Sequence, residues 1–148
     1  MTIGKESANR QDAHALRTLT PVECFDLLEP GGIGRVAFTS PAGEIMILPV
    51  NFAMTGKSII FRTAPDTLLA VYANAKVSFE ADRLDDALHE GWSVLVHGHT
   101  HKITDERDVK HLEDRTHLQP WAAGARDVYV RIAPTRISGR RILPGAGT

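Results

Sequence analysis

The sequence contains one cysteine, Cys24, among its 148 residues. A single cysteine cannot form a disulfide within the chain, so the fold needs no oxidising compartment. No apolar run approaches the roughly 18 residues of a membrane-spanning helix. The polar N-terminus also lacks the hydrophobic centre of a signal peptide. These absences predict a cytoplasmic protein that does not interact with membranes.

No sign of charge dominates the chain. Its 17 basic and 18 acidic residues give a formal net charge of −1. Such a balance produces no overall field that would attract nucleic acid or an acidic membrane. Because nucleic-acid-binding domains are normally more basic, we expect no nucleic acid among the partners. A chain of this length is expected to form one domain.

Short apolar segments separated by turn residues run through most of the chain. Residues 1–17 are polar and aperiodic, which predicts a flexible N-terminal tail. Thr20-Pro21-Val22-Glu23 has the pattern of a capping box and begins a helix that continues to Leu28. Strands are predicted over residues 33–39, 45–52, 58–63, 76–81, 91–103 and 128–132, a charged connection over 82–90, and a surface helix over 105–118. The pattern favours a mainly β fold, a closed or partly closed antiparallel barrel over residues 18–143, followed by a short tail at 144–148.

The most informative stretch runs from Ile47 to Leu69. Apolar side chains occupy both faces of its first strand, so that strand is buried or faces a ligand. Pro49 lacks a backbone N–H and is therefore expected where sheet pairing lapses. The backbone beside Pro49 would then be available to another group.

A possible phosphate site follows the second strand of this stretch. Arg62 and Thr63 end that strand, and Asp66 or Thr67 can cap the short helix that begins next. A cation and a hydroxyl beside a helix N-terminus are suited to bind phosphate. The alternative is that Arg62 is a solvated charge and Thr67 only a cap. The pattern by itself leaves both interpretations open.

Seven short motifs occur in a defined order from about Leu19 onward. They are Gly34-Arg35-Val36, PVNF at 49–52, FRT at 61–63, Thr67 before a helix, VSFE at 77–80, WSVLVHG at 92–98 and ISGRR at 137–141. In this order the chain resembles the pyridoxamine 5'-phosphate oxidase-like superfamily of FMN-binding split barrels. The resemblance implies a six-stranded antiparallel split barrel of Greek-key type. It also implies a homodimer with two cofactor sites at the subunit interface.

The resemblance further implies a set of cofactor contacts. They are Leu48, Pro49, Val50 and Asn51 along the flavin ring, Arg62, Thr63, Thr67 and Leu68 near the phosphate, and Trp92, Ser93 and Val94 on a later strand. Leu68 stands where similar proteins commonly have Lys or Arg. Losing a charge-assisted bond to phosphate costs about 1 kcal/mol or more, which is roughly tenfold in affinity. An arginine could compensate, either Arg62 or, from a second subunit, Arg136, Arg140 or Arg141.

The function implied is that of an FMN-dependent oxidoreductase acting on a small molecule. The flavin ring supplies the hydride chemistry, so no catalytic residue is identified. A deazaflavin-dependent reductase of the same fold and a non-enzymatic flavin or small-ligand binder are alternatives. The absence of a basic residue at Leu68 favours these alternatives. Trp92 and Trp121 could wall the substrate side, although packing is the commoner role of such aromatic residues.

Three other features have two interpretations each. His97, His99 and His101 alternate on one strand and could approach a zinc or nickel ion, but no cysteine or carboxylate completes the set, so we predict no metal. Glu80 is either exposed to water or part of a polar ligand wall. Gly98 lies on a predicted strand, where its missing side chain would admit a neighbouring backbone or a ligand. Cys24 lies in an apolar helix pattern and is interpreted as a small core residue.

Overall fold

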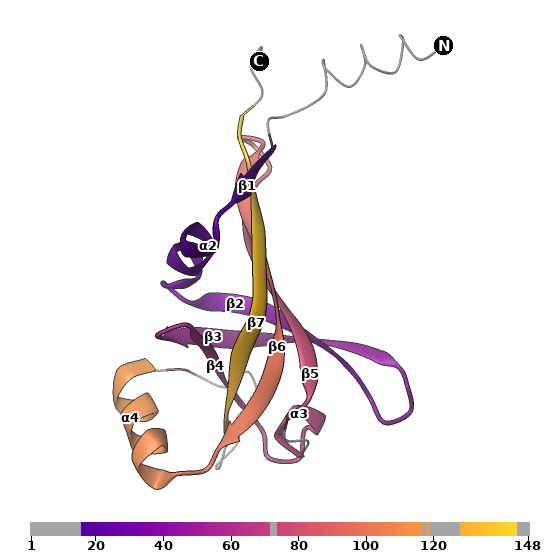
Figure 1. Ribbon diagram of the computed structural model, residues 1–148, viewed down its shortest axis with the longest axis vertical. Helices are drawn as coiled ribbons and strands as arrows, with labels where there is room; N and C mark the ends of the chain where they lie inside the picture. Colours follow the sequence, from indigo (N-terminus) through magenta and orange to yellow (C-terminus); the bar gives the residue numbers. More distant parts are fainter. Residues whose placement is uncertain (1–15, 72–73, 117, 119–127, 145–148) are drawn as a thin grey trace.

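The computed structural model describes residues 16–71, 74–116, 118 and 128–144. These residues form a closed antiparallel barrel with short helices on its outside (Figure 1). The strands are β1 (Leu16–Leu19), β2 (Gly32–Thr39), β3 (Ile45–Thr55), β4 (Ser58–Thr63), β5 (Lys76–Asp85), β6 (Glu90–Ile103) and β7 (Val128–Ile142). The helices are α2 (Pro21–Leu28), α3 (Leu68–Val71) and α4 (Glu106–Thr116). No helix in these described ranges is long and apolar enough to cross a membrane.

The long strand β7 closes the barrel. The strand order is β1-β7-β4-β3-β2-β5-β6, and β6 pairs with β7 to complete the ring. β4 and β1 pair with opposite ends of β7, and β6 pairs along most of its length. The prediction of a six-stranded antiparallel barrel is confirmed, and β1 is an additional short strand beside β7.

Helix α2 begins as the sequence predicts. The Glu23 amide donates to the Thr20 hydroxyl at 3.2 Å, and the Thr20 amide donates to the Glu23 carboxylate at 3.1 Å. Pro21 occupies the first turn of the helix. Backbone N–H groups in that turn have no intrahelical acceptor, so the N–H that proline lacks is not needed there. Cys24 and Leu28 then point into the barrel core and are fully buried.

Two strands extend further than their sequence pattern indicates. The predicted charged connection at 82–90 is mostly strand, because β5 continues to Asp85 and β6 begins at Glu90. The basic segment at 136–141 lies within β7. In both places pairing with neighbouring strands outweighs the polar composition, since charged side chains can stand on the solvent-facing side. β1 begins at Leu16, inside the segment expected to be a tail, and residues 1–15 and 145–148 lie outside the described residues.

The core fills the interior of the barrel. Inward side chains of successive strands meet there, including Phe52 and Phe79, whose rings pack edge to face at 5.0 Å. A second, smaller cluster lies outside the barrel beneath α4 and contains Ile60, Leu112, Leu118 and Tyr129. Each strand therefore has an inner face toward the core and an outer face, and the outer face positions the candidate site.

Gly98 lies at an irregularity in the pairing of β6 with β7. A Cβ atom at this position would lie 2.3 Å from the carbonyl oxygen of Ala133, closer than two such atoms can approach. The missing side chain thus admits a neighbouring backbone, one of the two possibilities predicted.

Candidate functional site

β3 and β4 separate halfway along β3. Their pairing ends at Phe52 with Phe61, after which β4 pairs with β7 through Arg62 and Thr63. In the described structure, the earlier part of β3 pairs only with β2. Pro49 lies in that part. Because β4 does not pair with β3 there, no carbonyl of β4 needs the N–H that proline lacks. The predicted lapse in pairing beside Pro49 is present.

The two faces of β3 have different surroundings. Leu48 and Val50 pack into the barrel core, so a ligand beside them would meet their backbone and not their side chains. Pro49 is exposed and Asn51 is half-buried on the outer face. The same outer face carries Ile45 and Ile47, which are 77% and 63% exposed. The apolar inner face is thus buried, while the apolar outer face has no cover within the described chain.

Thr63 and Thr67 join the end of β4 to the start of α3. Their hydroxyl oxygens are 2.9 Å apart. The Thr67 hydroxyl also donates to the carbonyl of Ala64 at 2.9 Å and accepts from the amide of Ala70 at 3.3 Å. Thr67 is therefore the helix cap, one of the two candidates predicted. Leu68 is apolar and packs against the barrel core. It therefore does not supply the positive charge that similar proteins have at this position.

Arg62 faces away from this pair of threonines. Its guanidinium donates to the carbonyl of Leu118 at 3.0 Å and lies over the ring of Tyr129, 5.2 Å from the ring centre. Successive strand residues point to opposite faces, so Arg62 and Thr63 project in opposite directions. The structure brings Thr63 and Thr67 together and directs Arg62 toward the cluster beneath α4. A phosphate contact by Arg62 stays a prediction.

The contacts predicted on β6 lie elsewhere. Val94 is buried in the core, Trp92 is half-buried against it, and Ser93 points outward. Trp92 pairs with Arg141, whereas Arg62 pairs with Tyr129 near the other end of β7. An extended strand between those two β7 positions spans roughly 40 Å. One chain therefore does not gather all of the predicted contacts in one place.

The outer face between β3 and β6 contains a charged cluster that the sequence left unresolved. The Arg35 guanidinium lies 3.6 Å from the Glu80 carboxylate and 4.0 Å from that of Asp82. Burial, followed by a hydrogen bond and charge repulsion from Asp82, raises the pKa of Glu80 to about 7, and Arg35 opposes this shift. Glu80 is thus part of a polar wall. The alternation of Ser78, Glu80 and Asp82 was the signal that could have revealed it.

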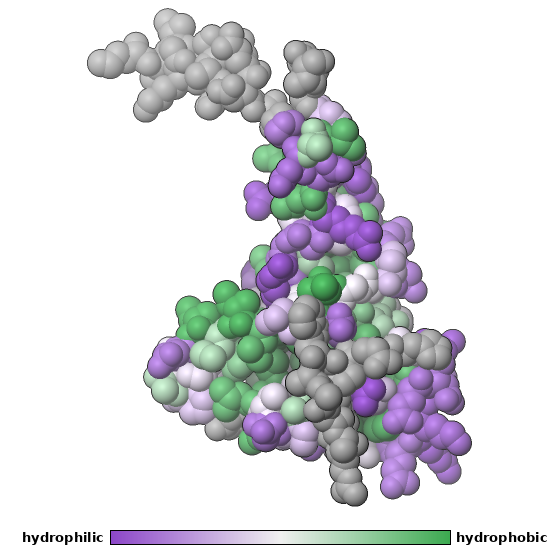
Figure 2. Space-filling view, turned by 180° about the vertical axis from the view of Figure 1, so that it is seen from behind, coloured by the Kyte–Doolittle hydropathy of each residue, from purple (hydrophilic) through white to green (hydrophobic). Residues whose placement is uncertain are grey.

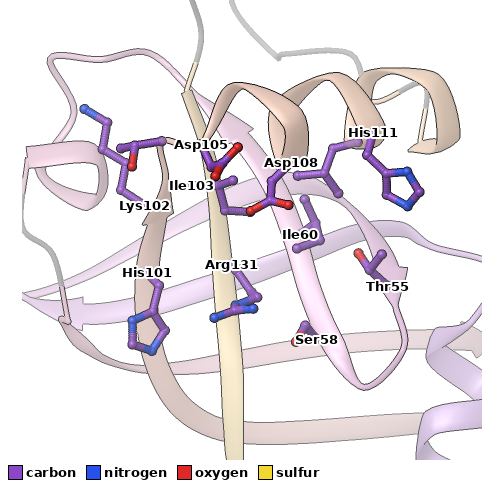
Figure 3. Close-up of a pocket in the computed structure, with 12 residues that line it drawn as sticks. Thr55, Ser58, Ile60, His101, Lys102, Ile103, Asp105, Asp108, His111 and Arg131 are labelled. Atoms are coloured by element: carbon purple, nitrogen blue, oxygen red, sulfur yellow. The ribbon is translucent and has the colours of Figure 1, made fainter.

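A polar depression beneath α4 is a separate feature (Figure 3). It has a volume of about 470 Å³ and combines the side chains of His101 and Arg131 with those of Asp105, Asp108 and His111. None of the predicted cofactor contacts lines it.

The histidines on β6 do not converge. His97 bonds through Nδ1 to the Ser78 hydroxyl at 2.9 Å, and His101 lines the depression beneath α4. Within the described ranges, no group of three or more His, Cys, Asp or Glu side chains is placed to hold a metal ion. Trp121 lies outside the described residues.

Cys24 is fully buried among apolar neighbours, as its sequence pattern indicates. Burial, with a smaller contribution from the charge of Glu23, raises the pKa of its thiol. A thiol that resists ionisation is a poor nucleophile, which agrees with a core role.

Sequence comparison relates the chain to a known family. The sequence profile named pyridoxamine 5'-phosphate oxidase matches residues 20–141. An uncharacterised protein of Mycobacterium tuberculosis, Rv0080, is 32% identical over 154 aligned residues that cover 100% of this chain and 99% of the relative.

Two solved structures are similar in both sequence and fold. The structure of the FAD binding protein from Mycobacterium smegmatis is 39% identical with a TM-score of 0.74, and the match covers 87% of this chain and 100% of that one. A candidate pyridoxamine 5'-phosphate oxidase from Corynebacterium glutamicum is 31% identical with a TM-score of 0.76, covering 91% and 98% of the two chains.

Proposed function

Because the chain belongs to the pyridoxamine 5'-phosphate oxidase family, we propose that it binds a flavin nucleotide and acts as a flavin-dependent oxidoreductase on a small molecule. The main support is the Mycobacterium smegmatis structure, which is 39% identical and is named as an FAD binding protein. FMN is the cofactor that we propose first, and FAD is the alternative that this relative suggests.

The flavin ring lies along the part of β3 that β4 leaves open. There Pro49 and Asn51 face outward, and the backbone of Leu48 and Val50 borders the opening. The flavin supplies the hydride chemistry when bound, and the protein orients the ring and limits access of water to it.

The phosphate group lies beside Thr63 and Thr67. Their hydroxyls already share a hydrogen bond, so both are held at the end of β4 with little conformational freedom to lose on binding. A neutral hydroxyl binds phosphate less strongly than a cation does. With Leu68 packed into the core, a second subunit could supply the missing cation from Arg136, Arg140 or Arg141.

We propose a homodimer with a cofactor site at each end of the subunit interface. Ser93 pairs with Asp82 on β5, and β2 lies between β5 and β3. At about 4.8 Å per strand, Ser93 is roughly 14 Å from the outer residues of β3. A contact from Ser93 to a ring on β3 therefore comes most directly from a second copy.

Two rival functions use the same site. The lack of a basic residue at Leu68 favours a cofactor bound with less reliance on a cation, such as a deazaflavin, or a non-enzymatic flavin carrier. Both rivals place the cofactor ring on β3. The first differs from the main proposal in the cofactor bound, and the second differs in having no turnover. We place the protein in the cytoplasm, since its one cysteine is a buried free thiol.

The first experiment is mass spectrometry of whatever small molecule co-purifies with the protein. Fluorescence titration of the stripped protein with FMN, FAD and deazaflavin then ranks the cofactors. Turnover with a reduced nicotinamide or a chemical electron acceptor distinguishes an enzyme from a carrier. The proposal is refuted if none of the three cofactors binds in the micromolar range.

A further inference from the structure

The depression beneath α4 lies between this helix and the outer face of the barrel. Strand register places Ile60 of β4, Arg131 of β7 and His101 of β6 side by side on that face. Ile60 belongs to the small cluster beneath the helix together with Leu112, which is the buried residue of α4. The depression is therefore apolar where the helix meets the sheet and polar on the side of Arg131 and His101.

The rest of α4 is charged. Figure 2 shows hydrophilic residues gathered at the lower right of the view, where this helix lies. The helix sequence ERDVKHLEDRT mixes acidic and basic residues, so its outer surface has no dominant charge. A small molecule with an apolar part therefore gains contact with apolar side chains of α4 on the side of the helix that faces the strands.

The two walls of the depression carry charges of opposite sign. Figure 3 shows Asp105 and Asp108 extending from α4 toward the strands, above Arg131 on β7. The Asp105 carboxylate is already engaged, because it accepts from the Arg107 amide at 2.8 Å. The side chains of Asp108 and Arg131 form no hydrogen bond or ion pair with any other described residue. They face one opening without meeting, which leaves room for a group that binds both.

A buried polar atom beside the depression also has no partner. The Thr55 hydroxyl oxygen is buried and makes no hydrogen bond to any residue that the structure describes. Thr55 ends β3 opposite Ser58 of β4, and both side chains line the depression. A buried hydroxyl without a partner is unfavourable, and in native proteins such groups are normally bonded to protein, water or a ligand. The depression thus offers a hydroxyl that a bound molecule can satisfy.

We propose that the depression beneath α4 binds a small zwitterion with an apolar body, such as an amino acid with a branched side chain. The carboxylate of this ligand pairs with Arg131, and its ammonium group pairs with Asp108. The apolar body packs against Ile60 and Leu112, and the Thr55 hydroxyl bonds to a polar atom of the ligand. None of the predicted cofactor contacts lines the depression, so the inference does not rest on flavin binding.

The opposite charges of the walls select a zwitterion over a simple ion. An anion bound to Arg131 would have Asp108 facing it, and a cation bound to Asp108 would have Arg131 facing it. Like charges brought together weaken binding, whereas a ligand with both charges has a partner on each wall. The volume of about 470 Å³ is within the range of small-molecule sites and accommodates an amino acid with its surrounding water.

The test is an NMR titration of the nitrogen-labelled full chain with leucine and with three compounds that each lack one of its groups. Isocaproate lacks the ammonium group, isoamylamine lacks the carboxylate, and glycine lacks the apolar body. Because the walls are partly exposed, each omission is expected to weaken binding by about threefold to tenfold. Equal binding of leucine and isocaproate would show a simple anion site and would overturn the proposal.

Two variants separate the charged contacts. Arg131→Gln is expected to weaken leucine and isocaproate by about threefold to tenfold and to spare isoamylamine. Asp108→Asn should weaken leucine and isoamylamine to a similar extent and spare isocaproate. Arg107→Gln and Asp114→Asn change the same residue types at exposed positions of α4 and are the matched controls. A variant that weakens all ligands equally would contradict the assigned contacts.

Thr55→Val keeps the shape of the side chain and removes the unpaired oxygen. The free protein is expected to melt at the same temperature or higher, because no hydrogen bond within the chain is lost, while leucine binds more weakly. A lower melting temperature with unchanged leucine affinity would give the hydroxyl a structural role and contradict its assignment to the ligand.

The proposal is overturned if leucine at millimolar concentrations shifts no resonance of the residues that line the depression. It is also overturned if the shifts are the same in Arg131→Gln, Asp108→Asn and the wild type. FMN titration of the same samples tests flavin binding separately, so failure of one proposal is distinguishable from failure of the other.

Discussion

Thr63 and Thr67 lie on different elements, yet their hydroxyl oxygens are only 2.9 Å apart. This hydrogen bond fixes the end of β4 against the start of α3. The two side chains thus form a small polar surface at the junction of β4 and α3.

Thr67→Ala is expected to raise the FMN dissociation constant by roughly fivefold to tenfold, because it removes a hydroxyl that can turn from the Ala64 carbonyl to donate to the phosphate. Thr67→Ser retains the hydroxyl and should bind nearly as tightly as the wild type. Fluorescence quenching of FMN measures both variants, and circular dichroism confirms that both are folded. Equal affinity of Thr67→Ala and the wild type would remove Thr67 from the phosphate site.

Arg62→Ala is expected to lower the free energy of unfolding by about 1 kcal/mol, because the guanidinium bonds to the Leu118 carbonyl. Its FMN affinity, measured beside it, tests the phosphate contact predicted from the sequence. Arg131→Ala is a suitable control, since Arg131 lies on the neighbouring strand in the depression beneath α4. The control should leave FMN affinity unchanged. A loss of stability in Arg62→Ala without any change in FMN affinity would assign Arg62 a purely structural role.

The pH dependence of stability should change in Glu80→Gln. The pKa of Glu80 in the folded chain, about 7, is above its ordinary value of 4.5, so the folded state binds more protons between these values. Stability from this group is therefore present below pH 4.5 and is lost as pH rises toward and past 7. Because the side chain is 36% exposed, we expect a loss of only about 1 kcal/mol after solvent screening.

Urea denaturation between about pH 5 and 8 measures this effect, at a protein concentration where sedimentation shows a monomer. The wild type should lose stability across the range relative to Glu80→Gln. Parallel curves for the two proteins would show that Glu80 titrates at its ordinary pKa.

Ile47→Asp is expected to abolish association, because it places a charge in the centre of the exposed apolar face. Val22→Asp introduces the same charge at a side chain that is 69% exposed on α2, and it should remain dimeric. Sedimentation velocity at micromolar concentration distinguishes the two results. A dimeric Ile47→Asp would place the interface elsewhere.

Gly98→Ala should destabilise the barrel by about 1 to 3 kcal/mol, the usual cost of overpacking. The added methyl group would lie 2.3 Å from the Ala133 carbonyl, so β6 and β7 must move apart. Thermal unfolding measures the effect. An unchanged melting temperature would mean that the irregularity at His97 and Gly98 absorbs the methyl group without strain.

Most of the local structure could be predicted from neighbouring residues. The capping box at Thr20 and Glu23 and the alternation along β2, β3 and β6 depend on short-range geometry, and the structure confirms them. The ends of β5 and β7 could not be predicted, because pairing partners far along the chain keep charged segments extended.

The sequence by itself determined which residues face inward and which turns connect them, because side-chain periodicity and backbone preferences act over a few positions. Only the tertiary structure decided that Arg62 reaches Leu118 and that Arg35 meets both Glu80 and Asp82. Those contacts depend on strand order and register, which bring together side chains that are far apart in the chain. The energies of ion pairs and buried carboxyl groups depend on a few ångströms of separation, and local patterns do not specify separations of that kind.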